Sequence, residues 1–152
     1  MVDLHVISQH DILKMDYGGF DLMDKLELIK YWEDTSDKDY TTMHHLFDSG
    51  DYHWSLFIGH IVIEKLLKAY YVKYVDDKVL FTHDLLRLAK SAGLEVDDSL
   101  ANSLDFITTF NISVRYPDYK QAFYKKCTKE FTGANIKRIE GVRTWLKKII
   151  NS

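Results

Sequence analysis

The sequence has one cysteine, one proline and no long apolar run. Cys127 alone cannot form an internal disulfide or a set of thiolate ligands, which excludes disulfide-rich, zinc-finger and dithiol redox proteins. No stretch approaches the roughly 20 apolar residues that a membrane-spanning helix needs. Acids and histidines interrupt the first residues, unlike a signal sequence. We therefore expect a cytoplasmic protein with no membrane partner.

The formal net charge of −3 conceals an uneven distribution of charges. Acidic side chains predominate in residues 1–60, whereas residues 119–152 carry nine Lys or Arg against two Glu. Two interpretations remain open. The acidic and basic parts can neutralise each other within the fold or a dimer, or the basic part can bind a polyanion.

The spacing of apolar residues predicts an all-α fold, an up-and-down bundle of four to five helices. No region shows the alternation that is typical of strands. Residues 1–24 lack a sustained period and predict an N-terminal extension, so a single domain would span residues 25–152. The helices are expected at 23–48 (one helix or a broken pair), about 52–74, 85 to Gly93, 97–115 and about 132–150, with a partly helical link before the last.

The helix expected at 52–74 is apolar over most of its surface, so its own bundle or a second subunit must cover it on several sides. Only Glu64, Lys65 and Lys68 make one quarter of it strongly polar. Glu64 and Lys68 are spaced i, i+4 and can pair on an exposed face. We interpret this quarter as a solvated stripe, with the wall of a nucleotide cleft as the alternative.

The stretch NISVRYPDYKQ contains the only proline, and Pro117 predicts that the preceding helix ends near Arg115. Arg115 could cap the carbonyl end of its own helix or pair with Asp118, which makes the segment a simple helix end. Alternatively, its guanidinium could bind a phosphate through two parallel hydrogen bonds. Tyr116 or Tyr119 would then stack on a base or ribose.

Three segments in this order resemble the HEPN domain family, named for higher eukaryotes and prokaryotes nucleotide-binding. They are LFDSGDYHWSLFIGHIVIEKLLKAYYV, with its Gly-x-Tyr turn and Glu-Lys-x-Leu-Lys-Ala helix, THDLLRLAKSAGL, with its His-x-Leu-x-x-Leu pattern, and SVRYPDY. The resemblance covers roughly residues 25–150. It implies a helical bundle that forms a homodimer, with the ends of the fourth helices at a shared cleft.

The resemblance also implies a nucleotide or RNA ligand and, as in some members, a nucleotidyltransferase partner in a toxin–antitoxin-like system. In the RNA-cleaving members, a histidine follows the cleft arginine after four to six residues. Lys120, Gln121 and Ala122 stand at those positions after Arg115, and no histidine follows His83. Histidine suits the base role because its pKa lies near neutrality. We therefore expect binding without catalysis, with a divergent ribonuclease and a structural dimeric adaptor as alternatives.

The remaining polar and aromatic residues have simpler interpretations. His83 is expected to cap the helix that follows it, and Trp32, Trp54 and Trp145 to lie in the core or at dimer contacts. His53 and His60 are seven apart and lack the spacing of a helical zinc site, so we expect no metal and no cofactor. The predicted nucleotide-binding residues are Glu64, Lys65, Lys68, His83, Arg115, Tyr116, Asp118, Tyr119 and Lys120.

Overall fold

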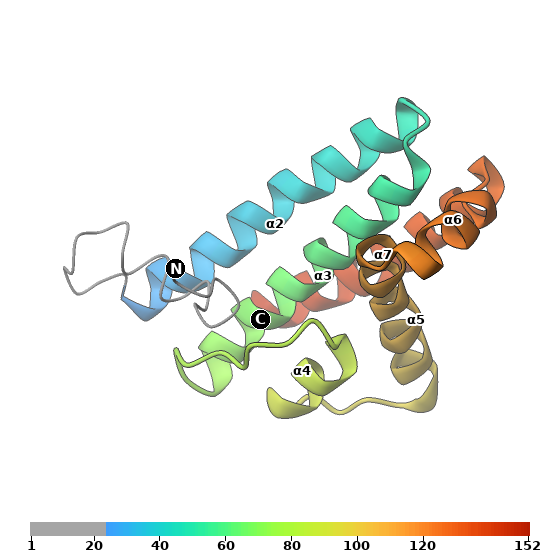
Figure 1. The fold of residues 1–152 in the computed structure, drawn as a ribbon. Helices are drawn as coiled ribbons and strands as arrows, with labels where there is room; N and C mark the ends of the chain where they lie inside the picture. Colours follow the sequence, from blue (N-terminus) through green and yellow to red (C-terminus); the bar gives the residue numbers. More distant parts are fainter. Residues whose placement is uncertain (1–23) are drawn as a thin grey trace, which may run out of the picture.

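The computed structural model describes residues 24–152, and this part of the chain is all-helical, with six helices and no strand (Figure 1). The predicted all-α bundle is confirmed. The N-terminal extension proposed for residues 1–24 lies outside the described residues, apart from Asp24. The helices are α2 (Lys25–Asp48), α3 (Tyr52–Tyr74), α4 (Leu85–Ser91), α5 (Asp98–Arg115), α6 (Pro117–Lys126) and α7 (Lys129–Ile150).

Helix α2 is one continuous helix rather than a broken pair. Asp24 begins it with a capping box, in which its side chain accepts from the Glu27 amide. The polar DTSDKD segment stays helical, and three of its side chains, those of Ser36, Asp37 and Asp39, have partners on other helices. Ser36 Oγ donates to the Val62 carbonyl at 2.8 Å, and Asp37 binds cations on α7.

Helix α3 is the centre of the bundle, as its apolar surface predicts. Helices α2, α4, α5 and α7 all pack against it (Figure 1). At Gly59 the packing leaves no room for a side chain, since a Cβ atom there would lie 2.5 Å from Ile139 Cδ1 and 3.0 Å from Met43 Sδ. The small residue therefore allows α2 and α7 to approach α3 closely. The bundle itself supplies the cover that this apolar helix requires.

The junction between α5 and α6 places the candidate site. Tyr116 is extended, with φ −107° and ψ 122°, as expected for a residue before proline. Pro117 thus ends α5 after Arg115 and also begins α6, where a missing amide hydrogen costs nothing. The link that was predicted to be partly helical is a separate helix, and Phe123 packs it against Phe110 at 5.8 Å between ring centres.

Helix α7 begins three residues before the predicted start. Thr128 is its N-cap and accepts a hydrogen bond from the Phe131 amide. Among the helices between residues 24 and 152, none combines the length and apolar character needed to cross a membrane.

Candidate functional site

Arg115 is the last residue of α5, and its side chain is turned back along its own helix. Its Nε donates to Asn111 Oδ1 at 2.8 Å, and its guanidinium carbon lies 5.7 Å from the centre of the Phe57 ring on α3. Within residues 24–152 the two Nη groups have no hydrogen-bond or ion-pair partner, and Asp118 does not bind them. Arg115 therefore neither caps α5 nor pairs with Asp118, and two donor groups remain available to a ligand.

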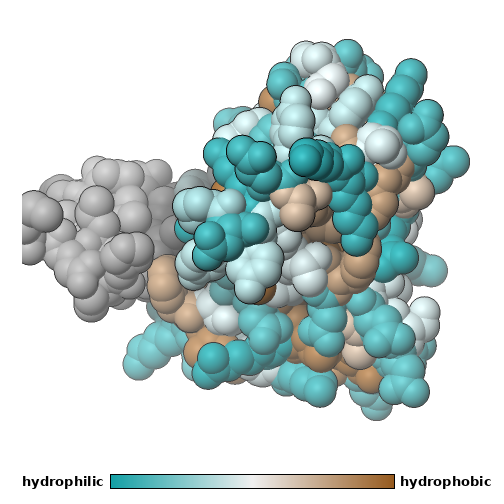
Figure 2. Space-filling model, turned by 45° about the vertical axis from the view of Figure 1, so that its right-hand side comes forward, coloured by the Kyte–Doolittle hydropathy of each residue, from teal (hydrophilic) through white to brown (hydrophobic). Residues whose placement is uncertain are grey.

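Tyr116 and Tyr119 follow Arg115 at the start of α6, and Trp54, at the start of α3, packs against the Phe57 ring that Arg115 faces, at 5.9 Å between ring centres. Tyr116, Tyr119 and Trp54 are 56%, 60% and 40% exposed. Lys120 Nζ lies 5.5 Å from the centre of the Trp54 ring and so joins α6 to the start of α3. We call this surface, made of Arg115, Tyr116, Tyr119, Lys120 and Trp54, the α5–α6 face. The side of the molecule that carries α5, α6 and α7 comes forward in Figure 2, where hydrophilic residues alternate with small hydrophobic areas.

Most basic residues of the C-terminal part of the chain have no carboxylate partner in the described residues. Of the basic residues after position 119, only Arg143 and Lys147 form ion pairs with an acid in the described chain, both with Asp37. Lys126 and Arg138 instead lie over the Phe106 ring, at 6.0 and 4.6 Å from its centre. The fold thus neutralises the basic C-terminal part only partially, and α6 keeps unpaired positive charge.

Beneath Arg115, a chain of polar side chains enters the core, and we call it the relay. Asn111 Nδ2 lies 3.4 Å from His60 Nδ1, and His60 Nε2 lies 2.8 Å from the carbonyl oxygen of His83. Asn111 is 3% and His60 0% exposed. Burial lowers the pKa of His60, against the opposite effect of the nearby Glu64 charge, so the ring is neutral at pH 7.

The His83 residue, whose carbonyl oxygen faces His60, binds a buried carboxylate with its own side chain. Glu64 Oε1 accepts from His83 Nδ1 at 2.6 Å, and Glu64 Oε2 lies 3.3 Å from Lys68 Nζ, which in turn lies 5.0 Å from the centre of the Trp32 ring. Burial acts to raise the pKa of Glu64, but the His83 hydrogen bond and the Lys68 charge outweigh it and leave this pKa below its ordinary value. Glu64 is therefore ionised and fully paired at neutral pH.

The solvated-stripe interpretation of this quarter of α3 is wrong. Glu64 and Lys68 are only 4% and 5% exposed, because α2 and the loop before α4 cover them. Lys65 points elsewhere and pairs with Asp39 of α2 at 2.6 Å. His83 does not cap α4 either, since the Asp84 side chain accepts from the α4 amide of Arg87.

The structure therefore brings together most of the residues that sequence reasoning selected. Glu64, Lys68 and His83 connect to Arg115 through the relay, whereas Lys65 lies at the α2–α3 interface. Tyr116, Asp118, Tyr119 and Lys120 are exposed at the start of α6. Their role in nucleotide binding remains a prediction.

Sequence reasoning missed the two middle members of the relay. His60 and Asn111 are the polar residues that interrupt the apolar faces of α3 and α5, and Asn111 precedes Arg115 by one helical turn. The signal available in the sequence was a polar residue on an otherwise apolar helix face, one turn from a candidate ligand residue.

Between residues 24 and 152 no group of three or more His, Cys, Asp or Glu side chains is placed to hold a metal ion. Cys127 is buried, which raises its pKa to about 11, so its thiol is protonated at neutral pH and is a weak nucleophile.

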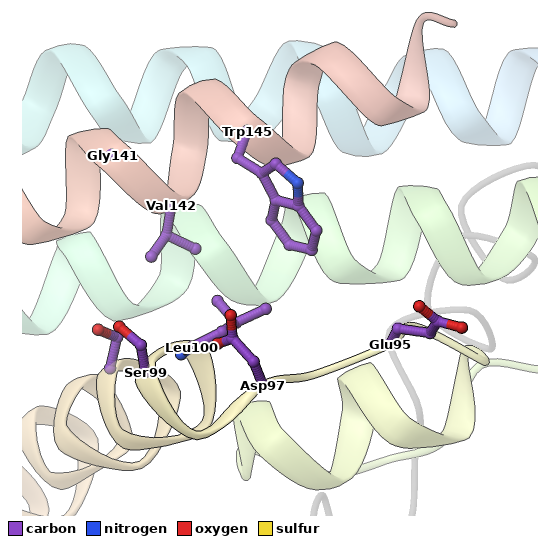
Figure 3. Close-up of a pocket in the computed structure, with 8 residues that line it drawn as sticks. Glu95, Asp97, Ser99, Leu100, Gly141, Val142 and Trp145 are labelled. Carbon is purple, nitrogen blue, oxygen red and sulfur yellow. Dashed lines mark hydrogen bonds between the residues drawn. The ribbon is translucent and has the colours of Figure 1, made fainter.

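A hollow of about 340 Å³ lies between α7 and the loop that leads into α5 (Figure 3). Trp145 and Val142 project from α7 towards Leu100, while Glu95 and Asp97 lie on the opposite side. These two carboxylates would repel a phosphate, so this hollow does not suit a nucleotide. The α5–α6 face, which carries positive charge, suits a phosphate group better.

Comparisons with known proteins agree with this architecture. The HEPN domain family model matches residues 29–149. Among solved structures, the chain is similar to TT1696 from Thermus thermophilus, with a TM-score of 0.68 and 17% sequence identity over 79% of this chain and 96% of that chain. At this identity the likeness shows the fold alone. No curated protein matches the sequence.

Proposed function

The chain belongs to the HEPN domain family, and on this premise we propose that it binds a nucleotide or an RNA strand at the α5–α6 face without cleaving it. One observation carries the proposal. Arg115 is held by its Nε and lies over the Phe57 ring, its two Nη groups have no partner in the described chain, and the exposed Tyr116 and Tyr119 follow it at the start of α6.

The face combines the two chemistries that nucleotide binding requires. A guanidinium can donate two parallel hydrogen bonds to phosphate oxygens and keeps its charge at any working pH. Exposed Tyr116, Tyr119 and Trp54 offer flat surfaces for a base, and stacking of this kind is worth about 1–3 kcal/mol per base. Lys120 adds a second positive charge next to Trp54.

Binding is favoured over cleavage because the histidine of the family's ribonuclease motif is absent. Lys120, Gln121 and Ala122 occupy its positions after Arg115. In α6, Lys120 lies against Trp54 and Gln121 and Ala122 are exposed, so no imidazole faces a ligand from this segment. The ligand would be held without a base to activate it.

RNA cleavage is the second candidate function, and a single observation favours it. His83 is 43% exposed in its side chain and donates from Nδ1 to the buried Glu64, so its Nε2 is left as a potential proton acceptor. This histidine comes from outside the expected motif. In such a reaction it would take the proton of the 2′-hydroxyl group.

The family also suggests the partners. We propose a homodimer in which two α5–α6 junctions share one cleft, and a nucleotidyltransferase protein as a partner in a toxin–antitoxin-like system. Light scattering at micromolar concentration tests the first, with a monomer as the contrary result. Co-purification with the product of an adjacent nucleotidyltransferase gene tests the second.

The binding proposal is tested by titrating the dinucleotide ApA against the intrinsic fluorescence of the protein. Arg115→Ala should weaken binding by about 10- to 100-fold, because a hydrogen bond to a charged group is worth about 1.5–3 kcal/mol. Arg87→Ala is the matched control, since Arg87 is an exposed arginine of α4 far along the chain from this face. Equal affinity in both variants would contradict the proposal.

The two candidate functions are separated by incubating the protein with total RNA in EDTA. The RNA should remain intact under the binding proposal. Cleavage that is lost in His83→Ala and in Arg115→Ala would establish the second candidate in its place.

A further inference from the structure

We propose that Asn111 and His60 are positioning residues that hold the Arg115 guanidinium ready for phosphate, an inference that rests on the binding function proposed above. Arg115 is an exposed side chain at a helix end, where an arginine is free to sample many rotamers. The Nε–Asn111 hydrogen bond of 2.8 Å selects one of them and leaves both Nη groups for the ligand. Such preorganisation reduces the entropy that binding costs.

Asn111 can hold Arg115 only in one of its two amide orientations. Arg115 has no acceptor atom, so Asn111 must present its oxygen to Nε. The amide nitrogen then faces His60 Nδ1 at 3.4 Å and needs an acceptor there. Because Asn111 is 3% exposed, water does not compete for either end of the amide.

His60 provides that acceptor because of its other ring nitrogen. Nε2 lies 2.8 Å from the His83 carbonyl oxygen, which can only accept, so Nε2 carries the hydrogen. In a neutral ring Nδ1 is then a lone pair that faces the Asn111 amide. The hydrogen bonds thus run in one direction, from Arg115 through Asn111 and His60 to the backbone before α4.

Protonation of His60 would reverse this arrangement. The ring would donate from both nitrogens, Asn111 would have to turn its oxygen towards His60, and Arg115 would lose its acceptor. The charged or titratable groups near His60 are Glu64 and Lys68 on α3, His83 before α4 and Arg115 on α5. Burial lowers the pKa of His60 from its ordinary 6.5. The relay is therefore intact at pH 7, and His60 becomes protonated only at a pH below 6.5.

The experiment measures ApA affinity across about pH 5 to 8, the range in which histidine charges change. ApA is used because its phosphodiester keeps a single negative charge throughout. For the wild-type protein, we expect constant affinity at and above pH 6.5, with any loss confined to lower pH, because burial lowers the pKa of His60 from 6.5. A loss of affinity that already begins above pH 6.5, or one that persists unchanged in His60→Gln, would overturn the positioning role.

Asn111→Asp tests the amide directly. The carboxylate still accepts from Arg115 but cannot donate to neutral His60, and its charge competes with the phosphate. We expect affinity at pH 7.5 to fall at least about tenfold. Asn102→Asp is the matched control, because Asn102 is an exposed asparagine of the same helix, and it should bind as the wild type does.

His60→Gln is the conservative variant, and we expect it to fold as the wild-type protein does. A glutamine amide offers one donor and one acceptor but does not titrate, so affinity at pH 7.5 should stay within about threefold and the loss at low pH should disappear. His60→Leu removes both groups and should weaken binding as Asn111→Asp does. Thermal unfolding followed by circular dichroism verifies that each variant is folded at the titration temperature.

Different results would overturn the proposed binding function and the positioning role of Asn111 and His60. Wild-type protein that does not bind ApA at any pH would overturn the proposed function and the relay with it. Binding that depends on Arg115 but not on Asn111 or His60, with the same pH profile in His60→Gln as in the wild type, would overturn the relay alone.

Discussion

Glu64 and Asp37 each bind two side chains, but their surroundings differ. Glu64 is 4% exposed and binds the buried Lys68 and the partly exposed His83. Asp37 has a side chain that is 43% exposed and holds Arg143 and Lys147 where α2 meets α7. Burial acts to raise the pKa of Asp37 as it does that of Glu64, and the hydrogen bond and charge of Lys147 outweigh it, so the Asp37 pKa is lowered.

The two clusters therefore differ in what they contribute to the stability of the fold. A half-exposed ion pair exchanges partners with water and contributes little to stability. Removing one partner of a buried ion pair lowers the stability of the fold strongly, because the other charge is then left in the core without a partner. The Glu64 cluster also continues through His83 and His60 towards Arg115, whereas the Asp37 cluster ends on two helices. The buried cluster therefore joins the core to Arg115, whereas the surface cluster joins only α2 and α7.

The largest expected effect comes from breaking the buried cluster. Glu64→Leu leaves the Lys68 ammonium buried without a carboxylate, and we expect the free energy of unfolding to fall by about 3–5 kcal/mol. Urea unfolding followed by circular dichroism measures this loss. The double variant with Lys68→Met should recover most of the stability, because it removes the stranded charge. A double variant as unstable as the single one would contradict this explanation.

The second effect is on the pH dependence of stability. The pKa of His60 is lower in the folded state than its ordinary 6.5, so its contribution is present above that value and is lost as pH falls below it. The pKa of Glu64 is also lowered, so its contribution is lost below 4.5. Thermal midpoints measured at several pH values should decline in these two stages. His60→Gln should remove the first decline and keep the second.

The smallest effect is expected at the surface cluster. Asp37→Asn should lower the free energy of unfolding by only about 0.2–1 kcal/mol, because solvent screens a half-exposed ion pair. Added salt should reduce this loss further. The same urea measurement compares it with Glu64→Leu, and losses of equal size would show that the two clusters do not differ as described.

Most of the helices could be predicted because their boundaries have local causes. The start of α3 after Gly50, the bounds of α4 and the end of α5 before Pro117 follow from turn glycines, an Asp cap and proline. Helix α6 was underestimated because a short polar helix has little apolar period of its own, and Phe123 and Cys127 stabilise it by packing. The match of the HEPN family model to residues 29–149 confirms the resemblance.

The candidate site could be predicted in part. Arg115 and its aromatic neighbours stand together in the sequence, so Pro117 sufficed to place them at a helix end. The environment of Glu64 and Lys68 could not be predicted, because a polar stripe has the same period whether it is in water or paired in a core. Asn111 and His60 lie 51 positions apart, and no local pattern joins them.

The sequence by itself determined the all-α fold, the family and the helix end that exposes Arg115, since these follow from side-chain periodicity and from the restricted backbone at Pro117. Only the tertiary structure decided that Glu64 is buried rather than solvated and that it connects to Arg115 through His83, His60 and Asn111. The physical reason is that burial and hydrogen-bond direction depend on which helices meet. Helix contacts bring together polar atoms that the chain itself keeps apart.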